Sequence, residues 1–142
     1  MYSPNFPGCL GVWSLMAILV YSPSAWAQTR IDLEVVSIAV RLARAKNENV
    51  VITAIVRNNG TETAEQVDLK LDLLKNGKRY KSIEDIPVLS HLPRLGSGLS
   101  IPVSLDPLPS GKYEAVMKVD PKNKIHETEE KNNEKSIHFE IR

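Results

Sequence analysis

The segment from Asp120 to Asn133 concentrates side chains that can bind a cation through oxygen. Calcium takes six to eight oxygen ligands from carboxylate, amide and carbonyl groups. Lys122 and Lys124 fall where an EF-hand loop would place ligands, and no glycine supplies its sharp turn. The alternative is that these Asp and Asn side chains bond to loop backbone. We expect that structural role and no cofactor, and keep calcium open for five candidates: Asp120, Asn123, Glu127, Glu130 and Asn132.

Other catalytic chemistry has little support in the sequence. His91, His126 and His138 are widely separated, and His126-Glu127 begins like the zinc-protease helix motif without its second histidine. There is no Gly-x-Ser-x-Gly nucleophile elbow. The sequence therefore predicts a non-enzymatic protein; a metal-assisted hydrolase using the carboxylate-rich segment is the less favoured alternative.

The N-terminal segment predicts export. An apolar run from Gly8 to Tyr21 is followed by Ala25-Trp26-Ala27, the layout of a cleavable signal peptide, although no Lys or Arg precedes Arg30. The run is shorter than the roughly 18 residues of a membrane-spanning helix. We therefore predict a signal peptide at 1–27, a periplasmic or secreted domain at 28–142, and no stable membrane insertion after cleavage; an uncleaved anchor is the alternative.

The predicted mature part has an even balance of charge. The net charge of +1 comes from interspersed Lys, Arg, Asp and Glu, with no basic stripe of the kind that binds nucleic acid. The one cysteine, Cys9, lies in the predicted signal peptide. The domain must therefore be stabilised by packing, without a disulfide.

Apolar residues alternate with polar ones along most of the chain after Gln28. This period of two places one face of each strand in a core and the other in water. Asp32–Val40 changes phase between Val35 and Ile38, which predicts a β-bulge. Val50–Asn58 is nearly apolar throughout, and we place Val50, Ile52, Ala54 and Val56 on its core face. Further strands are expected at 67–73, 79–83 (weakest), 99–105, 113–119 and 136–141.

The breaks between these segments contain turn-forming residues. Asn76-Gly77 predicts a tight hairpin, and Pro102 predicts that its strand lies at a sheet edge. Residues 86–98 are expected to form a long irregular connection. Together these features predict an all-β, seven-stranded antiparallel immunoglobulin-like sandwich, with a barrel as the alternative. Tyr113 is a candidate for the tyrosine that bonds back to backbone at a corner of such folds.

The segment between the last two expected strands resembles CARDB domains, the cell-adhesion-related domains found in bacteria. Val119-Asp120-Pro121, Asn123, Ile125, Glu127, Glu130 and Asn132-Asn133 match their pattern. Val56–Thr61, which contains Asn58 and Gly60, and Leu108–Tyr113 are similar too. The resemblance covers Ile31 to Ile141. It implies an immunoglobulin-like sandwich with an extracytoplasmic role in adhesion or protein interaction, and structural roles for Asn58, Gly60, Tyr113, Asp120, Pro121 and Asn133.

A protein partner is the function that these observations favour. Exposed strand edges can accept another strand, and apolar side chains outside the expected core can add specificity. The surface candidates are Val51, Ile55, Leu89, Leu92 and Leu95, with burial beneath the long connection or the opposite sheet as the alternative for each. An accessory subunit, inhibitor or chaperone of an exported enzyme is the alternative function. The sequence does not indicate the partner or the oligomeric state.

Overall fold

The computed structural model describes residues 30–42, 48–96 and 98–142. The side chains of residues 87–90 also lie outside what is described. The predicted signal peptide at 1–27 and Cys9 therefore fall outside the described residues. No helix in the described ranges is long and apolar enough to cross a membrane.

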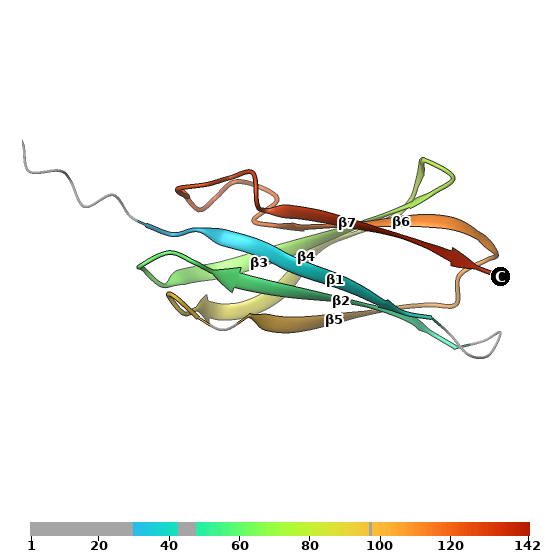
Figure 1. The fold of residues 1–142 in the computed structure, drawn as a ribbon, viewed down its shortest axis with the longest axis horizontal. Helices are drawn as coiled ribbons and strands as arrows, with labels where there is room; N and C mark the ends of the chain where they lie inside the picture. The colour runs from blue at the N-terminus through green and yellow to red at the C-terminus, as the bar shows by residue number, and fades with distance from the viewer. Residues whose placement is uncertain (1–29, 43–47, 97) are drawn as a thin grey trace, which may run out of the picture.

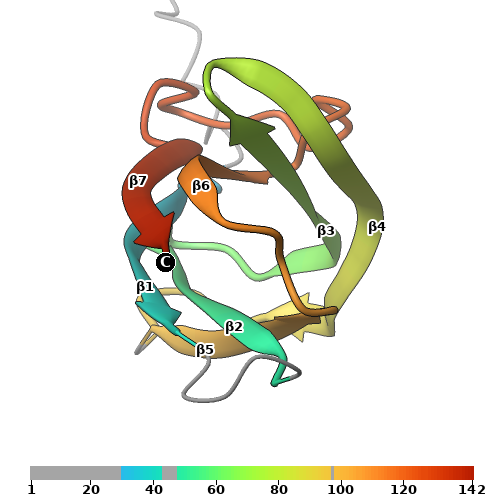
Figure 2. The same cartoon turned by 90° about the vertical axis from the view of Figure 1, so that its right-hand side faces the viewer.

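Seven strands in two antiparallel sheets make up the described chain. One sheet has the order β1-β2-β5 and the other the order β4-β3-β6-β7. The sheets face each other as a sandwich (Figures 1 and 2), which confirms the predicted fold class. The strands are β1 (Leu33–Arg41), β2 (Val50–Asn58), β3 (Ala64–Lys75), β4 (Lys78–Leu92), β5 (Leu99–Leu105), β6 (Gly111–Val119) and β7 (Glu134–Ile141).

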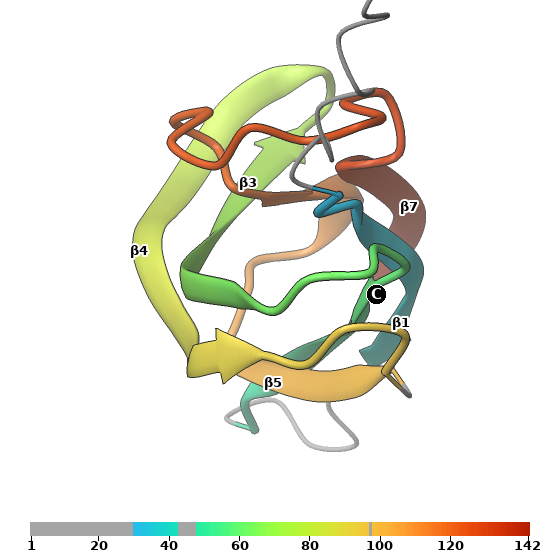
Figure 3. The same ribbon diagram turned by 90° about the vertical axis from the view of Figure 1, so that its left-hand side faces the viewer.

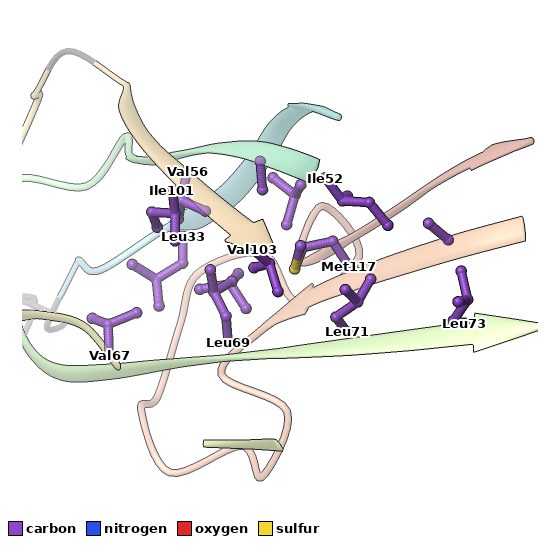
Figure 4. Close-up of a cluster of buried hydrophobic side chains, with 14 of the residues drawn as sticks. Leu33, Ile52, Val56, Val67, Leu69, Leu71, Leu73, Ile101, Val103 and Met117 are labelled. Atoms are coloured by element: carbon purple, nitrogen blue, oxygen red, sulfur yellow. The ribbon is translucent and has the colours of Figure 1, made fainter. Parts of the chain in front are cut away.

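The core lies between the two sheets and is built from alternate residues of the strands. Val50, Ile52, Ala54 and Val56 of β2 are buried, which confirms the predicted core face. The apolar residues at alternate positions of β3 meet them from the other sheet, with Met117 of β6 between (Figure 4). Each large apolar side chain buried in this way contributes about 1.5–3 kcal/mol. This packing takes the place of a disulfide in the described part of the chain.

Two local predictions about the strands are confirmed. The pairing of β1 with β2 changes register between Val35 and Ser37, where the phase of the sequence slips. Pro102 is exposed on β5, which is an edge strand. Proline has no N–H to donate, so it is tolerated where a ladder has a free side.

The prediction of an irregular connection from residue 86 is wrong for its first half. β4 continues to Leu92, and Ala64 of β3 pairs with Leu92. Register shifts in the β3–β4 ladder and a positive φ of 53° at Asp85 absorb the breaks in alternation. Pro87 fits because β4 is also an edge strand. The strand predicted to be weakest is therefore the longest, at 15 residues.

Turn chemistry closes the sandwich at the end where the C-terminus lies. Asn76 and Gly77 both have positive φ, 50° and 77°, as a tight hairpin turn requires. The Tyr113 hydroxyl donates to the Pro109 carbonyl at 2.8 Å, the bond expected of a tyrosine corner. The Tyr113 ring also stacks on Phe139, with centroids 5.5 Å apart.

Replacing Tyr113 with Phe removes this hydrogen bond and keeps the ring. We expect the free energy of unfolding to fall by about 1 kcal/mol, the usual contribution of one such bond. Chemical denaturation would measure it. Tyr80→Phe, at a more exposed ring that meets Tyr113 edge-on, is the matched control. Equal stability of Tyr113→Phe and the wild type would show that the corner bond contributes nothing.

Candidate functional site

The oxygen-rich segment from Asp120 to Asn133 links β6 to β7 beside the start of β1 (Figure 3). Asp120 is buried with a φ of 42°. Its two carboxylate oxygens accept the backbone N–H groups of Lys124 at 3.1 Å and Ile125 at 2.8 Å. Its carbonyl accepts the N–H of Asn123 at 3.0 Å. The Asp120 side chain therefore organises the loop by accepting hydrogen bonds from backbone N–H groups of the loop. The half-buried Pro121 follows Asp120 at the turn.

Glu127 fastens the loop to the first strand. It is only 6% exposed. One carboxylate oxygen accepts the backbone N–H of Leu33 at 2.7 Å, and the other accepts the side-chain amide of Asn133 at 2.8 Å. Beside it, Ile31 and Glu127 form a parallel bridge, and the Ile31 carbonyl accepts the N–H of Thr128 at 2.9 Å. The start of β1 is thus held by residues more than 90 positions away.

Burial raises the pKa of Glu127 to about 7. The hydrogen bonds from Leu33 and Asn133 act in the opposite direction, since they favour the carboxylate, while the nearby negative charges of Glu130 and Asp120 raise the pKa further. Both the protonated form and the carboxylate of this group are therefore populated near neutral pH.

Asn132 and Asn133 complete the fastening of the loop. The Asn132 side-chain amide donates to the Asp32 carboxylate at 2.7 Å, and the Asn132 backbone carbonyl accepts the N–H of Val35 at 3.1 Å. The Asn133 backbone carbonyl accepts the N–H of Val119, and the Asn133 side-chain amide also donates to the Glu130 carboxylate at 3.3 Å. The Oδ1 atoms of both asparagines are buried without a partner among the described residues.

Asn58 and Gly60 hold the same N-terminal segment from the other side. The Asn58 side-chain oxygen accepts the N–H groups of Asp32 and Gly60 at 3.3 and 2.9 Å. Its amide donates to the carbonyls of Glu62 and Leu92 at 2.7 and 3.2 Å. A Cβ at position 60 would overlap the Arg30 backbone. Only glycine lets the two chain segments approach so closely.

The geometry assigns these polar residues to structure more than to metal chemistry. The carboxylate oxygens of Asp120 and Glu127 are occupied by N–H donors. Lys122 and Lys124 are paired with Asp85 at 2.6 Å and Asp68 at 3.3 Å. Within residues 30–42, 48–96 and 98–142, no group of three or more His, Cys, Asp or Glu is placed to hold a metal ion. His91 lies on β4, His126 in the loop and His138 on β7.

The surface candidates separate into different environments. Val51 and Ile55 are half-buried on the outer face of β2, and Leu95 is 70% exposed. The prediction of a surface position is wrong for Leu92, because its side chain is 2% exposed and belongs to the core. It was misplaced because β4 extends further than the turn residues suggested. Leu89 of β4 pairs with Val67 of β3, and the side chain of Leu89 lies outside the described part.

Val51 and Ile55 lie within an uncharged surface that the sequence analysis did not recognise. The register of β1, β2 and β5 places small or apolar neighbours beside them, except that Arg41 at the end of β1 is opposite Val51. We call this surface the three-strand face; it consists of Ser37, Ala39, Val51, Thr53, Ile55, Ser100, Pro102 and Ser104. The Glu34–Arg57 ion pair, at 2.8 Å, bounds one end of it and Arg41 the other. The absence of charge between these two ends, at the middle outward positions of the three strands, was the signal available in the sequence.

The outer face of the other sheet has the opposite character. Lys70 pairs with Asp72 at 3.2 Å and with Glu84 at 3.4 Å, and His138 lies 3.7 Å from Glu114. Lys118 and Glu134 are neighbours in the β6–β7 register. The two outer faces of the sandwich therefore differ sharply in charge.

Stability should depend on pH through Glu127. Because its folded pKa is about 7 and its ordinary value is 4.5, the folded state binds more protons between these values. The free energy of unfolding should therefore fall by about 2 kcal/mol from pH 5 to pH 8. Denaturation across this range measures it. Glu127→Gln should flatten the profile and Glu130→Gln should not; a wild-type stability that rises with pH would contradict the assignment.

The comparisons with known proteins agree with this fold. No curated protein matches the chain. The CARDB domain of a Pyrococcus furiosus protein, crystallised in complex with di-metal ions, is 21% identical with a TM-score of 0.60, covering 78% of this chain and 88% of that one. A domain of a protein assigned to the cell surface of Methanosarcina acetivorans is 22% identical with a TM-score of 0.52, covering 78% and 91%. The CARDB family matches residues 30–137, so the chain belongs to the CARDB family.

Proposed function

We propose that this CARDB domain is a non-enzymatic protein-binding module that acts outside the cytoplasm and binds through the three-strand face. The observation that carries the proposal is the contrast between this uncharged face and the charged outer face of the other sheet. The cores of protein interfaces are depleted of charged residues, because a buried charge loses its hydration. A face three strands wide whose charges lie only at its two ends is therefore the surface best suited to be covered.

The side chains of this face fit a protein partner with a largely apolar surface. Val51 and Ile55 supply branched apolar groups in its middle strand, and Thr53 lies between them. Ser100 and Ser104 add hydroxyl groups that can bond to a partner's backbone. A Cβ at position 98 would overlap the Ile55 side chain, so Gly98 leaves room for it.

An extracytoplasmic location is supported by the predicted signal peptide and by the likeness to a domain of a protein assigned to the cell surface. An adhesion module and an accessory subunit, inhibitor or chaperone of an exported enzyme would use the same face. They differ only in the protein that is bound.

Photo-crosslinking tests the face directly. We would place p-benzoylphenylalanine at Thr53 and, as the matched control, at Val116, which is half-buried on the outer face of the other sheet. We expect a crosslinked product with an extracytoplasmic protein of the source cells from position 53 only, and we expect excess unlabelled domain to suppress it. Equal crosslinking from both positions, or a product from position 116 alone, would refute the proposed face.

Calcium binding by the loop is the second candidate. The observation in its favour is that the carboxylates of Glu127 and Glu130 both reach the Asn133 amide, at 2.8 and 3.3 Å. A related CARDB domain was crystallised with di-metal ions. Against it, Asp120 and Glu127 already accept N–H groups with both of their oxygens.

Thermal melts in calcium and in chelator decide between a structural loop and a calcium site. We expect equal melting temperatures, because the oxygens of Asp120 and Glu127 already accept N–H groups. Calcium that bound only the folded state would raise the melting temperature with its concentration. A calcium-dependent increase that disappears in Glu130→Gln would establish the site instead.

A further inference from the structure

The sandwich has four strand edges, and three of them carry features that hinder pairing with another strand. β4 contains Pro87 and shifts of register, and β5 contains Pro102. β1 has a register shift at Val35, and the Lys135 ammonium donates to the Val36 carbonyl at 2.7 Å. Prolines, bulges and lysines are the usual protections of an edge strand.

The fourth edge, β7, lacks these protections beyond its start. It pairs with β6 through eight consecutive residues without a register shift or a proline. The hydrogen bonds that join β1 to this region are at the beginning of β7, from Val35 to Asn132 and from Lys135 to Val36. Within its own sheet β7 has no strand on its second side, and β1 of the other sheet lies next to it (Figure 2).

Apolar side chains along this half of β7 are incompletely covered. Ile137, Phe139 and Ile141 point toward the core but remain half-buried, because no strand of the same sheet lies beyond them. A further strand placed beside β7 would cover their open sides and pair its backbone.

We propose that β7 pairs with β7 of a second copy of this chain, antiparallel about a two-fold axis at Phe139. The two four-stranded sheets then form one continuous eight-stranded sheet. An interface in which the same surface meets itself is the commonest arrangement in homodimers. The pairing is possible whichever residues point their N–H groups outward, because antiparallel ladders alternate between bonded and unbonded pairs.

Charge selects the register of this pairing. Residues directly opposite each other share a face. An axis at Phe139 places His138 opposite Glu140 of the second copy and Ile137 opposite Ile141. An axis at Ile137 would place Glu134 opposite Glu140, two like charges, and an axis at His138 would place this histidine opposite itself. The first register places apolar residues opposite apolar ones and His138 opposite Glu140, with no residue opposite a like charge.

Engineered disulfides test the register. In a Cys9→Ser background, which leaves no other cysteine, we would prepare His138→Cys and Glu140→Cys separately. Cβ atoms of opposite residues are about 4.5–5.5 Å apart and those of diagonal residues about 7–8 Å apart, and a disulfide needs the shorter separation. We expect a disulfide dimer from the mixed variants and none from either variant alone. A dimer from either single variant, or none from the mixture, would overturn the proposal.

The oligomeric state tests the charge contact. Sedimentation equilibrium of the full-length gene product should show a dimer. Glu140→Lys should raise the dissociation constant about tenfold, since it removes both cross-strand contacts between His138 and Glu140. Glu134→Lys is the matched control, because both glutamates are exposed and each faces a lysine of β6. A wild type that stays monomeric, or equal effects of both variants, would overturn it. The three-strand face belongs to the other sheet, so these results are independent of the proposed function.

Discussion

The structure depends on contact between the apolar faces of two sheets. No cysteine occurs in the described residues, so the free energy lost in ordering the chain is offset by burial of alternate side chains. Val67, Leu69, Leu71 and Leu73 of β3 are all buried, opposite the buried residues of β2 and β5. Because the other face of every strand stays outside, the same alternation determines which side chains can meet a partner.

Buried polar residues solve a second problem, which the apolar core cannot. The chain enters the sandwich at residues 30–33, before β1 is fully paired with β2, and its backbone groups there still need hydrogen bonds. Glu127 and Asn58 supply them to Leu33 and Asp32. This requirement gives a physical reason for the residues through which the chain resembles the CARDB family. Glu127 and Asn58 are costly to bury, and each bonds to a partner from a distant part of the sequence.

The division of the surface follows from the same architecture. The four-stranded sheet carries its charges outward in neighbouring pairs such as Lys70 and Asp72, which suits contact with water. The three-strand face has no such pairs, and the regular edge of β7 lies on the other sheet. A protein partner on the three-strand face and a second copy of the chain on the β7 edge would therefore not compete for the same residues.

The sequence alone determined the features that depend on near neighbours. Alternation identified the fold class, the core face of β2 and the bulge in β1, because the two-residue period is a property of any strand with one buried face. Local turn chemistry located the hairpin at Asn76-Gly77 and the edge position of Pro102. The tertiary structure decided the rest. β4 can extend through Pro87 because β3 lies on one side of it only. This extension brings Leu92 into the core. The partners of Glu127 also required the fold, because Leu33 is 94 residues away and nothing in the local sequence specifies which donor will meet that carboxylate.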